Sequence, residues 1–176
     1  MRIAHAIDSG YTIIELLIVI VLLGIFASLI VFVPSNLQDS GDDQERTDDI
    51  SSIARRLEMA YDAQDLGTPS YPSTVEFNND LTTKTRTASR IPQDALKAPG
   101  SSTSSVVMAT SNSSTSPIAG SINNTQYVYQ PLTASGALCN ASDSTTSAAN
   151  YCVGFFLYYR SVTEDKVKKV MSIHQQ

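Results

Sequence analysis

The sequence predicts an α+β fold in which a long N-terminal helix packs, over its second half, on a small antiparallel β-sheet. Three observations predict this class. Residues 11–33 are almost wholly apolar. From Ile50 onward, apolar residues recur at the spacing of an amphipathic helix. Residues 151–159 are rich in β-branched and aromatic side chains, as strands are. A chain of 176 residues has room for one modest globular domain and an additional element.

The apolar segment 11–33 has the length of a membrane-spanning helix. At 1.5 Å per residue it measures about 35 Å, enough to cross a hydrocarbon core of ~30 Å. A cleaved secretory signal has a shorter apolar region and ends at a small-residue site, which the sequence FVPS at 32–35 does not offer. A plain single-span anchor explains the length but not Glu15, because an ionisable group within a span costs about 2.5–3.5 kcal/mol. We therefore expect a membrane segment that carries a functional carboxylate.

The residues around this carboxylate form a specific pattern. Gly10 is followed by the aromatic Tyr11, three further residues, Glu15 and then a long apolar run. This pattern resembles the N-terminal signature of type IV pilins and pseudopilins, and implies the type IV pilin fold. It also implies the following division of the chain: leader peptide 1–10, transmembrane and filament-core helix 11–34, acidic neck and amphipathic helix 35–66, Ser/Thr-rich loop region 67–126, and antiparallel sheet with a disulfide-bounded loop 127–176.

The resemblance implies processing at the boundary between leader and helix. A prepilin peptidase would cut between Gly10 and Tyr11, and Tyr11 would then be N-methylated. Glycine suits the cleavage position because a residue without Cβ fits a tight protease cleft. Phenylalanine is commoner as the first mature residue, so Tyr11 departs from the pattern, although its ring is also large and flat.

Three further residues of this segment acquire roles from the resemblance. Glu15 would meet the positive N-terminal amine of a neighbouring subunit and set the axial register; alternatively, it reaches the headgroups from near the helix end. Gly24 and Pro34 lie near positions where related filaments contain locally melted helix, and both residue types weaken a helix. The alternatives are that Gly24 permits close packing and that Pro34 bends or ends the span.

The segment that follows is acidic and then amphipathic. Residues 39–49 hold six acidic residues against Arg46 alone, which predicts a solvated neck, or else a patch complementary to basic residues of another subunit. Gly67 and Pro69 should end the helix. Tyr71-Pro72-Ser73 resembles the ending of the second half of the pilin helix. The apolar stripe of this helix consists of Ile50, Ile53, Ala54, Leu57 and Tyr61. The basic residues considered as its counterpart are Lys166, Lys168 and Lys169.

The remainder of the chain divides into a loop region and a sheet. Within 67–126 only Val106, Val107 and Met108 indicate a strand, because Ser, Thr, Asn, Gly and Pro dominate. Residues 127–129, 151–159 and 167–173 read as strands, the last two joined by a turn at 162–165. One face of this sheet should cover the apolar stripe of the helix.

Two cysteines, Cys139 and Cys152, predict a disulfide. A close pair in an exported domain is typical of one bond closing a short loop, which is worth about 3 kcal/mol in the chain-entropy model. In pilins such a cysteine-bounded region lies on the filament surface, so the bond would serve both stability and surface shape.

Composition excludes several functions. A net charge of -5 is unfavourable for a nucleic-acid surface. Once the leader is lost only His174 remains, at a C-terminus expected to fray, which is unfavourable for histidine catalysis or metal binding. Phosphate-binding loops, nucleophile elbows and zinc spacings are absent from the sequence. We therefore expect no enzyme activity, no catalytic residue, no cofactor and no metal.

These inferences favour a structural subunit of a type IV pilus that polymerises through its N-terminal helix, with adhesion, motility or DNA uptake as functions of the fibre. The expected partners are other copies of the chain, other pilins, a prepilin peptidase and a membrane assembly platform. The precursor would span the cytoplasmic membrane once, with its C-terminal domain outside. The alternatives are a minor pilin or pseudopilin of a secretion or competence system, and a monomeric membrane-anchored binding module.

Overall fold

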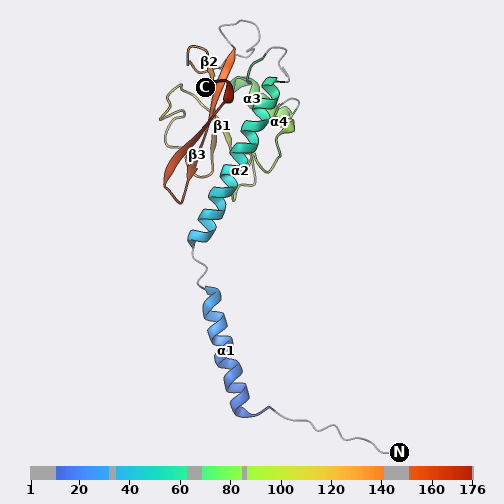
Figure 1. The fold of residues 1–176 in the computed structure, drawn as a ribbon, viewed down its shortest axis with the longest axis vertical. Helices are drawn as coiled ribbons and strands as arrows, with labels where there is room; N and C mark the ends of the chain where they lie inside the picture. The colour runs from blue at the N-terminus through green and yellow to red at the C-terminus, as the bar shows by residue number, and fades with distance from the viewer. Residues whose placement is uncertain (1–10, 32–34, 63–68, 85–86, 141–150, 176) are drawn as a thin grey trace, which may run out of the picture. The chain divides into compact units, whose positions relative to one another are not determined.

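The structure is a computed structural model that describes residues 11–31, 35–62, 69–84, 87–140 and 151–175. The chain divides into two compact units, Met1–Leu37 and Gln38–Gln176. The first contains α1 (Ile13–Val31) and the beginning of α2 (Ser35–Asp62). The second contains the rest of α2, two short helices and a four-stranded sheet (Figure 1). This is the α+β arrangement expected of a pilin fold.

Helix α2 buries the predicted apolar stripe. Ile50, Ile53 and Leu57 are fully buried, and Ala54 and Tyr61 pack at the edge of the same cluster. These positions recur every three or four residues, so they lie along one side of the helix. The helix ends at Asp62. Of the two residues predicted to end it, Gly67 lies outside the described residues and Pro69 lies beyond the helix.

The acidic segment, predicted as a solvated neck, is helical and is in part buried. Residues 39–49 are helical and belong to α2. Arg46 and Asp49 are buried, and Asp43 is partly buried. The sequence analysis missed the buried residues because it counted charges along the sequence and did not consider that every third or fourth residue of a helix shares one face. On α2 that face lies against the sheet.

The predicted loop region contains two helices. Helix α3 (Thr74–Thr83) begins at Ser73, whose hydroxyl accepts the backbone N–H of Glu76, while the Glu76 carboxylate accepts that of Ser73. This is a capping box. The sequence signal was present in S-T-V-E at 73–76, but the surrounding Ser, Thr and Asn residues concealed it. Lys84 then ends the helix in the left-handed region, and α4 (Thr87–Arg90) follows.

The sheet is mixed, with strand order β1-β2-β3-β4. Its members are β1 (Val106–Met108), β2 (Tyr127–Thr133), β3 (Cys152–Ser161) and β4 (Lys166–Met171). Strands β2, β3 and β4 are antiparallel, as predicted, but β1 runs parallel to β2. The long connection between β1 and β2 permits this, because a parallel pair needs a crossover of a dozen or more residues. A tight hairpin turn at 162–165 joins β3 to β4, with Asp165 in the left-handed region.

Each face of the sheet has its own apolar cluster. On the α2 side, aromatic residues of the sheet and the α2–α3 connection meet the helix stripe. They include Tyr71, Tyr129 and Phe155, and Phe77 of α3 joins them. On the other side, Ala109, Ile118 and Ile122 of the β1–β2 connection cover Val128 and Tyr158. The connection that made β1 parallel therefore also closes the second face. A short 3₁₀ helix, η2 (Ile173–Gln175), ends the chain.

Candidate functional site

The start of α1 holds the predicted assembly residues. The hydroxyl and the carbonyl oxygen of Thr12 accept the backbone N–H of Glu15, at 3.3 Å and 3.1 Å respectively. Thr12 thus caps the helix, and Glu15 is its third residue. A carboxylate in the first turn is favoured by the helix dipole. Thr12 and Glu15 are also spaced as the ends of a capping-box sequence, a local reason for a carboxylate at this position that the sequence analysis did not consider.

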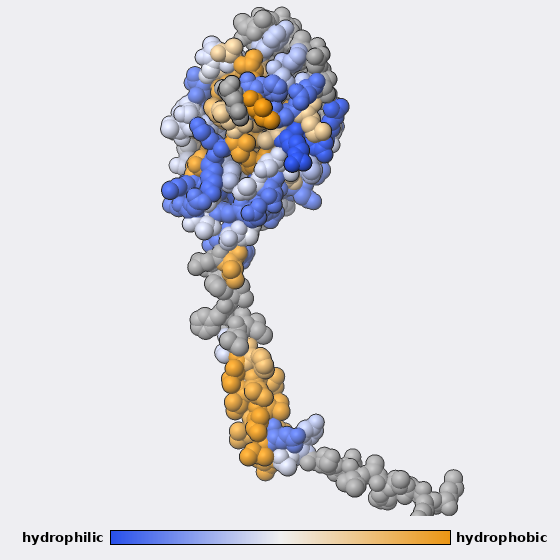
Figure 2. Space-filling model, viewed as in Figure 1, coloured by the Kyte–Doolittle hydropathy of each residue, from blue (hydrophilic) through white to orange (hydrophobic). Residues whose placement is uncertain are grey.

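The surface of α1 is apolar and exposed. Every described side chain from Tyr11 to Ser28 is exposed, including Ile13 at 89% and Leu23 at 62%. The orange surface of this helix in Figure 2 contrasts with the mostly hydrophilic surface of the second unit. Judged on the described residues alone, no helix combines the length and the apolarity needed to cross a membrane.

The structure gives different information about each residue predicted for the N-terminal segment. Tyr11 is 79% exposed just before α1. Gly24 lies within the continuous helix, and a Cβ placed on it would meet nothing within 4 Å. The other two, Gly10 and Pro34, lie outside the described residues. Cleavage, methylation and local helix melting therefore stay predictions.

At the beginning of the second unit, Asp43 joins α2 to the β3–β4 turn. Its carboxylate accepts the Ser161 hydroxyl at 2.7 Å and the backbone N–H groups of Val162 and Thr163 at 2.9 Å. Burial raises the pKa of Asp43, but these hydrogen bonds outweigh it and hold the pKa well below its usual range. Arg46 completes the contact with an ion pair to Asp43 at 2.9 Å.

One turn and a half further on, Asp49 joins α2 to β2. The Tyr127 hydroxyl donates to its carboxylate at 2.6 Å. Burial, opposed by this hydrogen bond and reinforced by the charges of Glu45, Asp48 and Asp94, raises the pKa of Asp49 to about 6. Three exposed carboxylates therefore gather around this buried one.

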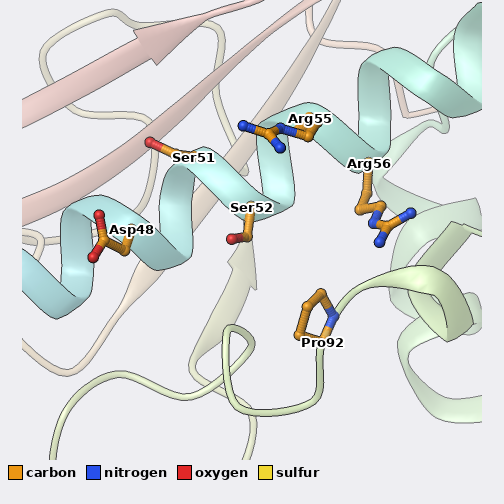
Figure 3. A pocket seen from close by; sticks show the side chains of 6 residues that line it. All are labelled: Asp48, Ser51, Ser52, Arg55, Arg56 and Pro92. Carbon is orange, nitrogen blue, oxygen red and sulfur yellow. The ribbon is translucent and has the colours of Figure 1, made fainter.

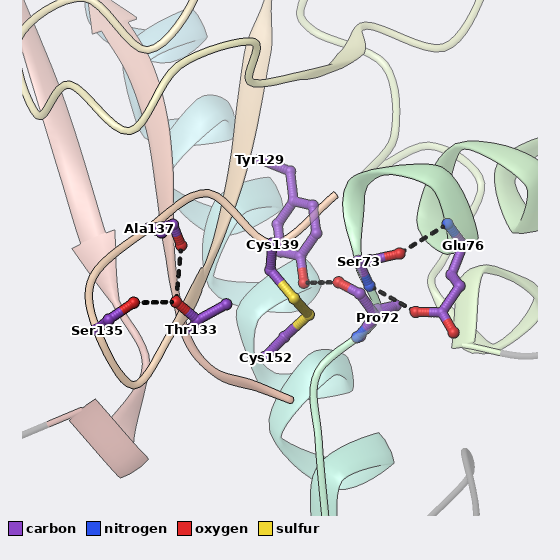
Figure 4. The surroundings of a disulfide bond; sticks show 9 residues. All are labelled: Pro72, Ser73, Glu76, Tyr129, Thr133, Ser135, Ala137, Cys139 and Cys152. Atoms are coloured by element: carbon purple, nitrogen blue, oxygen red, sulfur yellow. Dashed lines mark hydrogen bonds between the residues drawn. A yellow bond between two sulfur atoms is a disulfide. The ribbon is translucent and has the colours of Figure 1, made fainter. Parts of the chain in front are cut away.

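The predicted disulfide is present. Cys139, after β2, is bonded to Cys152, the first residue of β3, with their Cα atoms 5.7 Å apart. The backbone carbonyl groups of the two bonded cysteines also hold the connection between α2 and α3. Tyr71 donates its N–H to the Cys152 carbonyl at 2.8 Å, and Thr74 donates to the Cys139 carbonyl at 3.0 Å. Figure 4 shows Pro72 beside the disulfide, its carbonyl accepting the Tyr129 hydroxyl.

The C-terminus is held against α2, contrary to the expectation that it would fray. Glu58 accepts the Tyr71 hydroxyl at 2.5 Å and the Ile173 N–H at 2.9 Å. Nδ1 of His174 lies 3.1 Å from Glu58, and its ring packs 4.1 Å from that of Tyr61. Burial and Glu58 raise the pKa of Tyr71 above its usual range, so it stays a neutral donor. Sequence reasoning missed this cluster because Ile173 and His174 lie more than 100 residues beyond the other members.

A polar hollow of about 320 Å³ opens between α2 and the loop at Pro92. Figure 3 shows Asp48, Ser51, Ser52, Arg55 and Arg56 along one side and Pro92 on the other. The two arginines lie about two helical turns beyond Asp48. No group of three or more His, Cys, Asp or Glu side chains suited to a metal ion occurs among the described residues.

Comparison with known proteins bears directly on the N-terminal segment. A family model described as the prokaryotic N-terminal methylation motif matches residues 7–31, which include the predicted cleavage position and Glu15. The chain carries this N-terminal motif, and the matched residues include the whole of helix α1.

Two curated relatives extend this likeness beyond the motif. Over 77 residues, 44% of its length, the chain is 39% identical to a type II secretion system core protein G of Pectobacterium carotovorum subsp. carotovorum. Over the same length it is 38% identical to the protein of that name from Klebsiella michiganensis. The matches cover 47% and 51% of those proteins, so the chain spans about half the length of the curated relatives it matches. No solved structure matches the chain.

Proposed function

We propose that this chain is a structural subunit that polymerises through α1 into a helical filament of the type II secretion class, and that it has no catalytic role. The proposed life cycle begins with a membrane precursor whose C-terminal unit lies outside the cytoplasmic membrane. A prepilin peptidase removes residues 1–10, and an assembly platform in the membrane adds the processed subunit to the filament.

The observation that carries this proposal is the exposed apolar surface of α1. Every described side chain of this helix is exposed, and Glu15 is its single charged residue. An apolar surface of this extent is unfavourable in water, so it needs lipid or other apolar helices around it. Lipid tails and leucine side chains are similarly apolar, so transfer from the membrane to a bundle of α1 helices costs little and packing decides the outcome.

Within that bundle, Glu15 supplies the polar contact. An α-amino group has an unperturbed pKa of about 7.7–8.0, so the new terminus at Tyr11 is largely protonated at neutral pH. The Glu15 carboxylate of one subunit pairs with the Tyr11 amine of its neighbour. Such a buried pair contributes little net stability, but separating its members is costly, so it fixes the register of the subunits.

Two measurements test the proposal. In filaments sheared from cells, intact mass and N-terminal sequencing should find a chain that begins at methylated Tyr11. Deleting the chain should also stop the export of proteins that a type II system secretes. A chain that retains Met1 and stays in the membrane fraction would instead identify a monomeric anchored module.

The second candidate is a subunit of a type IV pilus, favoured by the cysteine-bounded segment between β2 and β3. It predicts that deletion removes surface fibres, adhesion or twitching and leaves protein secretion intact. The same deletion strain therefore distinguishes the two filaments.

A further inference from the structure

One side of the second unit carries an acidic face, which we define as Glu45, Asp48 and Asp94. All three side chains are exposed, and their charges all act on the buried Asp49. Glu45 and Asp48 are neighbours on α2 because they are three residues apart. Asp94 belongs to the loop between α4 and β1. Asp49, next to these carboxylates, accepts a hydrogen bond from Tyr127 at the start of β2. The acidic face therefore lies nearer to β2 than to the last strand, β4.

The edge strand β4 carries a basic strip, which we define as Lys166, Lys168 and Lys169. Side chains alternate along a strand, so Lys166 and Lys168 flank this edge on one face of the sheet and Lys169 flanks it on the other. Strand β4 is the last strand in the order β1-β2-β3-β4. Lys166 and Lys169 are exposed; Lys168 is half-buried and pairs with Glu164. The Lys169 ammonium lies 4.8 Å from the centre of the Phe156 ring, which holds its stem along the sheet. Lysines on an edge strand also prevent unwanted strand pairing, so the strip has a protective role in the single subunit.

The positions of these two surfaces matter for assembly. A contact between two different surfaces of the same subunit leaves one of each free on the pair, so further copies can be added in the same way. A filament requires such a contact, whereas a self-complementary surface would stop at a dimer. Opposite charges on two different surfaces of the subunit satisfy this requirement.

We propose that the basic strip of one copy docks on the acidic face of the next copy along the filament. This inference rests on the proposed polymerisation and names the contact that the second units make in it. Arg55 and Arg56 limit the docking position. They line the hollow beyond Asp48 on α2 and repel lysines placed further along the helix. The strip therefore sits at the Glu45–Asp48 end, and the charges select one register as well as one partner.

Charge reversal in the full-length chain tests this contact. Lys166→Glu with Lys169→Glu makes both surfaces acidic, and Glu45→Lys with Asp48→Lys makes both basic. Each pair should reduce sheared filaments about tenfold or more, because like charges then oppose each other at every contact. Co-expressing the two variants, or combining all four substitutions in one chain, should restore filaments to near the wild-type amount.

Asp62→Lys serves as the matched control. Asp62 is an exposed carboxylate on α2, about 20 Å along the helix from Asp48. This variant should assemble as the wild type does. Filaments that persist at wild-type level in both reversed pairs would overturn the docking contact and leave polymerisation through α1 standing. A wild-type chain that forms no filament would overturn both proposals.

Cysteine cross-linking provides an independent readout. Asp48→Cys and Lys169→Cys in one chain should give a ladder of disulfide-linked oligomers in filaments, whereas either substitution alone should give none. Filaments of the double variant that contain no ladder would contradict the contact. The native Cys139–Cys152 bond is internal to the chain and does not contribute to such a ladder.

Discussion

Helices α1 and α2 use apolar residues in opposite ways. In α1 they occur on all sides, and none of the described side chains is buried within the chain. In α2 they form one stripe, in which Ile50, Ile53 and Leu57 are completely buried beneath the sheet. The stripe holds one subunit together, whereas the surface of α1 is available to lipid or to other subunits. In the proposed filament, the apolar residues that fold the subunit and those that bundle subunits therefore belong to separate helices, and substitutions in the two apolar sets should affect folding and assembly independently.

The largest expected effect separates assembly from folding. In the proposed filament, replacing Glu15 with Ala would leave the terminal amine of the neighbouring subunit buried without a partner, which costs about 3–5 kcal/mol. We expect filaments to be almost absent, while the circular dichroism and melting temperature of the second unit in detergent stay unchanged. Glu15→Asp, which keeps the charge on a shorter side chain, should retain part of the assembly. Normal filament yield in Glu15→Ala would contradict the role of this carboxylate.

A matched pair of leucines tests the difference between the two helices. Leu57→Ala removes a fully buried side chain and should lower the free energy of unfolding by about 2–5 kcal/mol. Leu17→Ala removes a side chain that is 57% exposed on α1, and should leave that free energy unchanged. Urea unfolding of the full chain in detergent, followed by circular dichroism, measures both. A comparable loss in the two variants would mean that α1 contributes to the stability of the second unit.

The disulfide should influence folding far more than polymerisation. Replacing both Cys139 and Cys152 with Ser removes a cross-link between residues 13 apart in the sequence, which is worth about 3 kcal/mol in the chain-entropy model. The variant should unfold at lower urea concentration and be degraded faster outside the membrane. Subunits that do fold should still enter filaments. If folded subunits accumulated without assembling, the cysteine-bounded segment would have to lie in a subunit contact.

Asp49 gives the smallest effect and a distinct pH dependence. Its pKa is about 6 in the folded chain, above the ordinary 3.8, so the folded state binds the extra proton between those values. The contribution of the protonated Asp49 carboxyl to the free energy of unfolding is thus fully present below about pH 4 and is lost as the pH rises through about 6. Asp49→Asn should remove this loss and raise the free energy of unfolding at pH 7 by about 1–2 kcal/mol.

Urea midpoints at pH 4, 5, 6 and 7 measure this effect, with Asp48→Asn as the exposed control. The amide oxygen that Asp49→Asn introduces can still accept the Tyr127 hydroxyl, so the substitution changes charge more than packing. An unchanged pH profile in Asp49→Asn would mean that Asp49 is ionised in the folded chain at pH 4 as in the unfolded chain.

The sequence by itself determined the features that depend on spacing along the chain. Glycine, an aromatic residue and glutamate before an apolar run identified the N-terminal motif, and period 3.6 identified the buried stripe of α2. The last two strands and their turn followed from residue type, since 162–165 is a short polar interval between two such runs. These are local properties, so a linear pattern is sufficient to reveal them.

Tertiary structure alone decided how distant residues meet. In the acidic segment of α2, Asp43 and Asp49 face the sheet, because helix geometry and packing select which residues face inward. The tertiary structure paired β1 in parallel with β2, and it brought His174 to Glu58 across 116 positions of sequence. It also set the acidic face on α2 and the α4–β1 loop, and the basic strip on the edge strand β4. Each of these arrangements depends on the path of the chain through space, which spacing along the sequence does not specify.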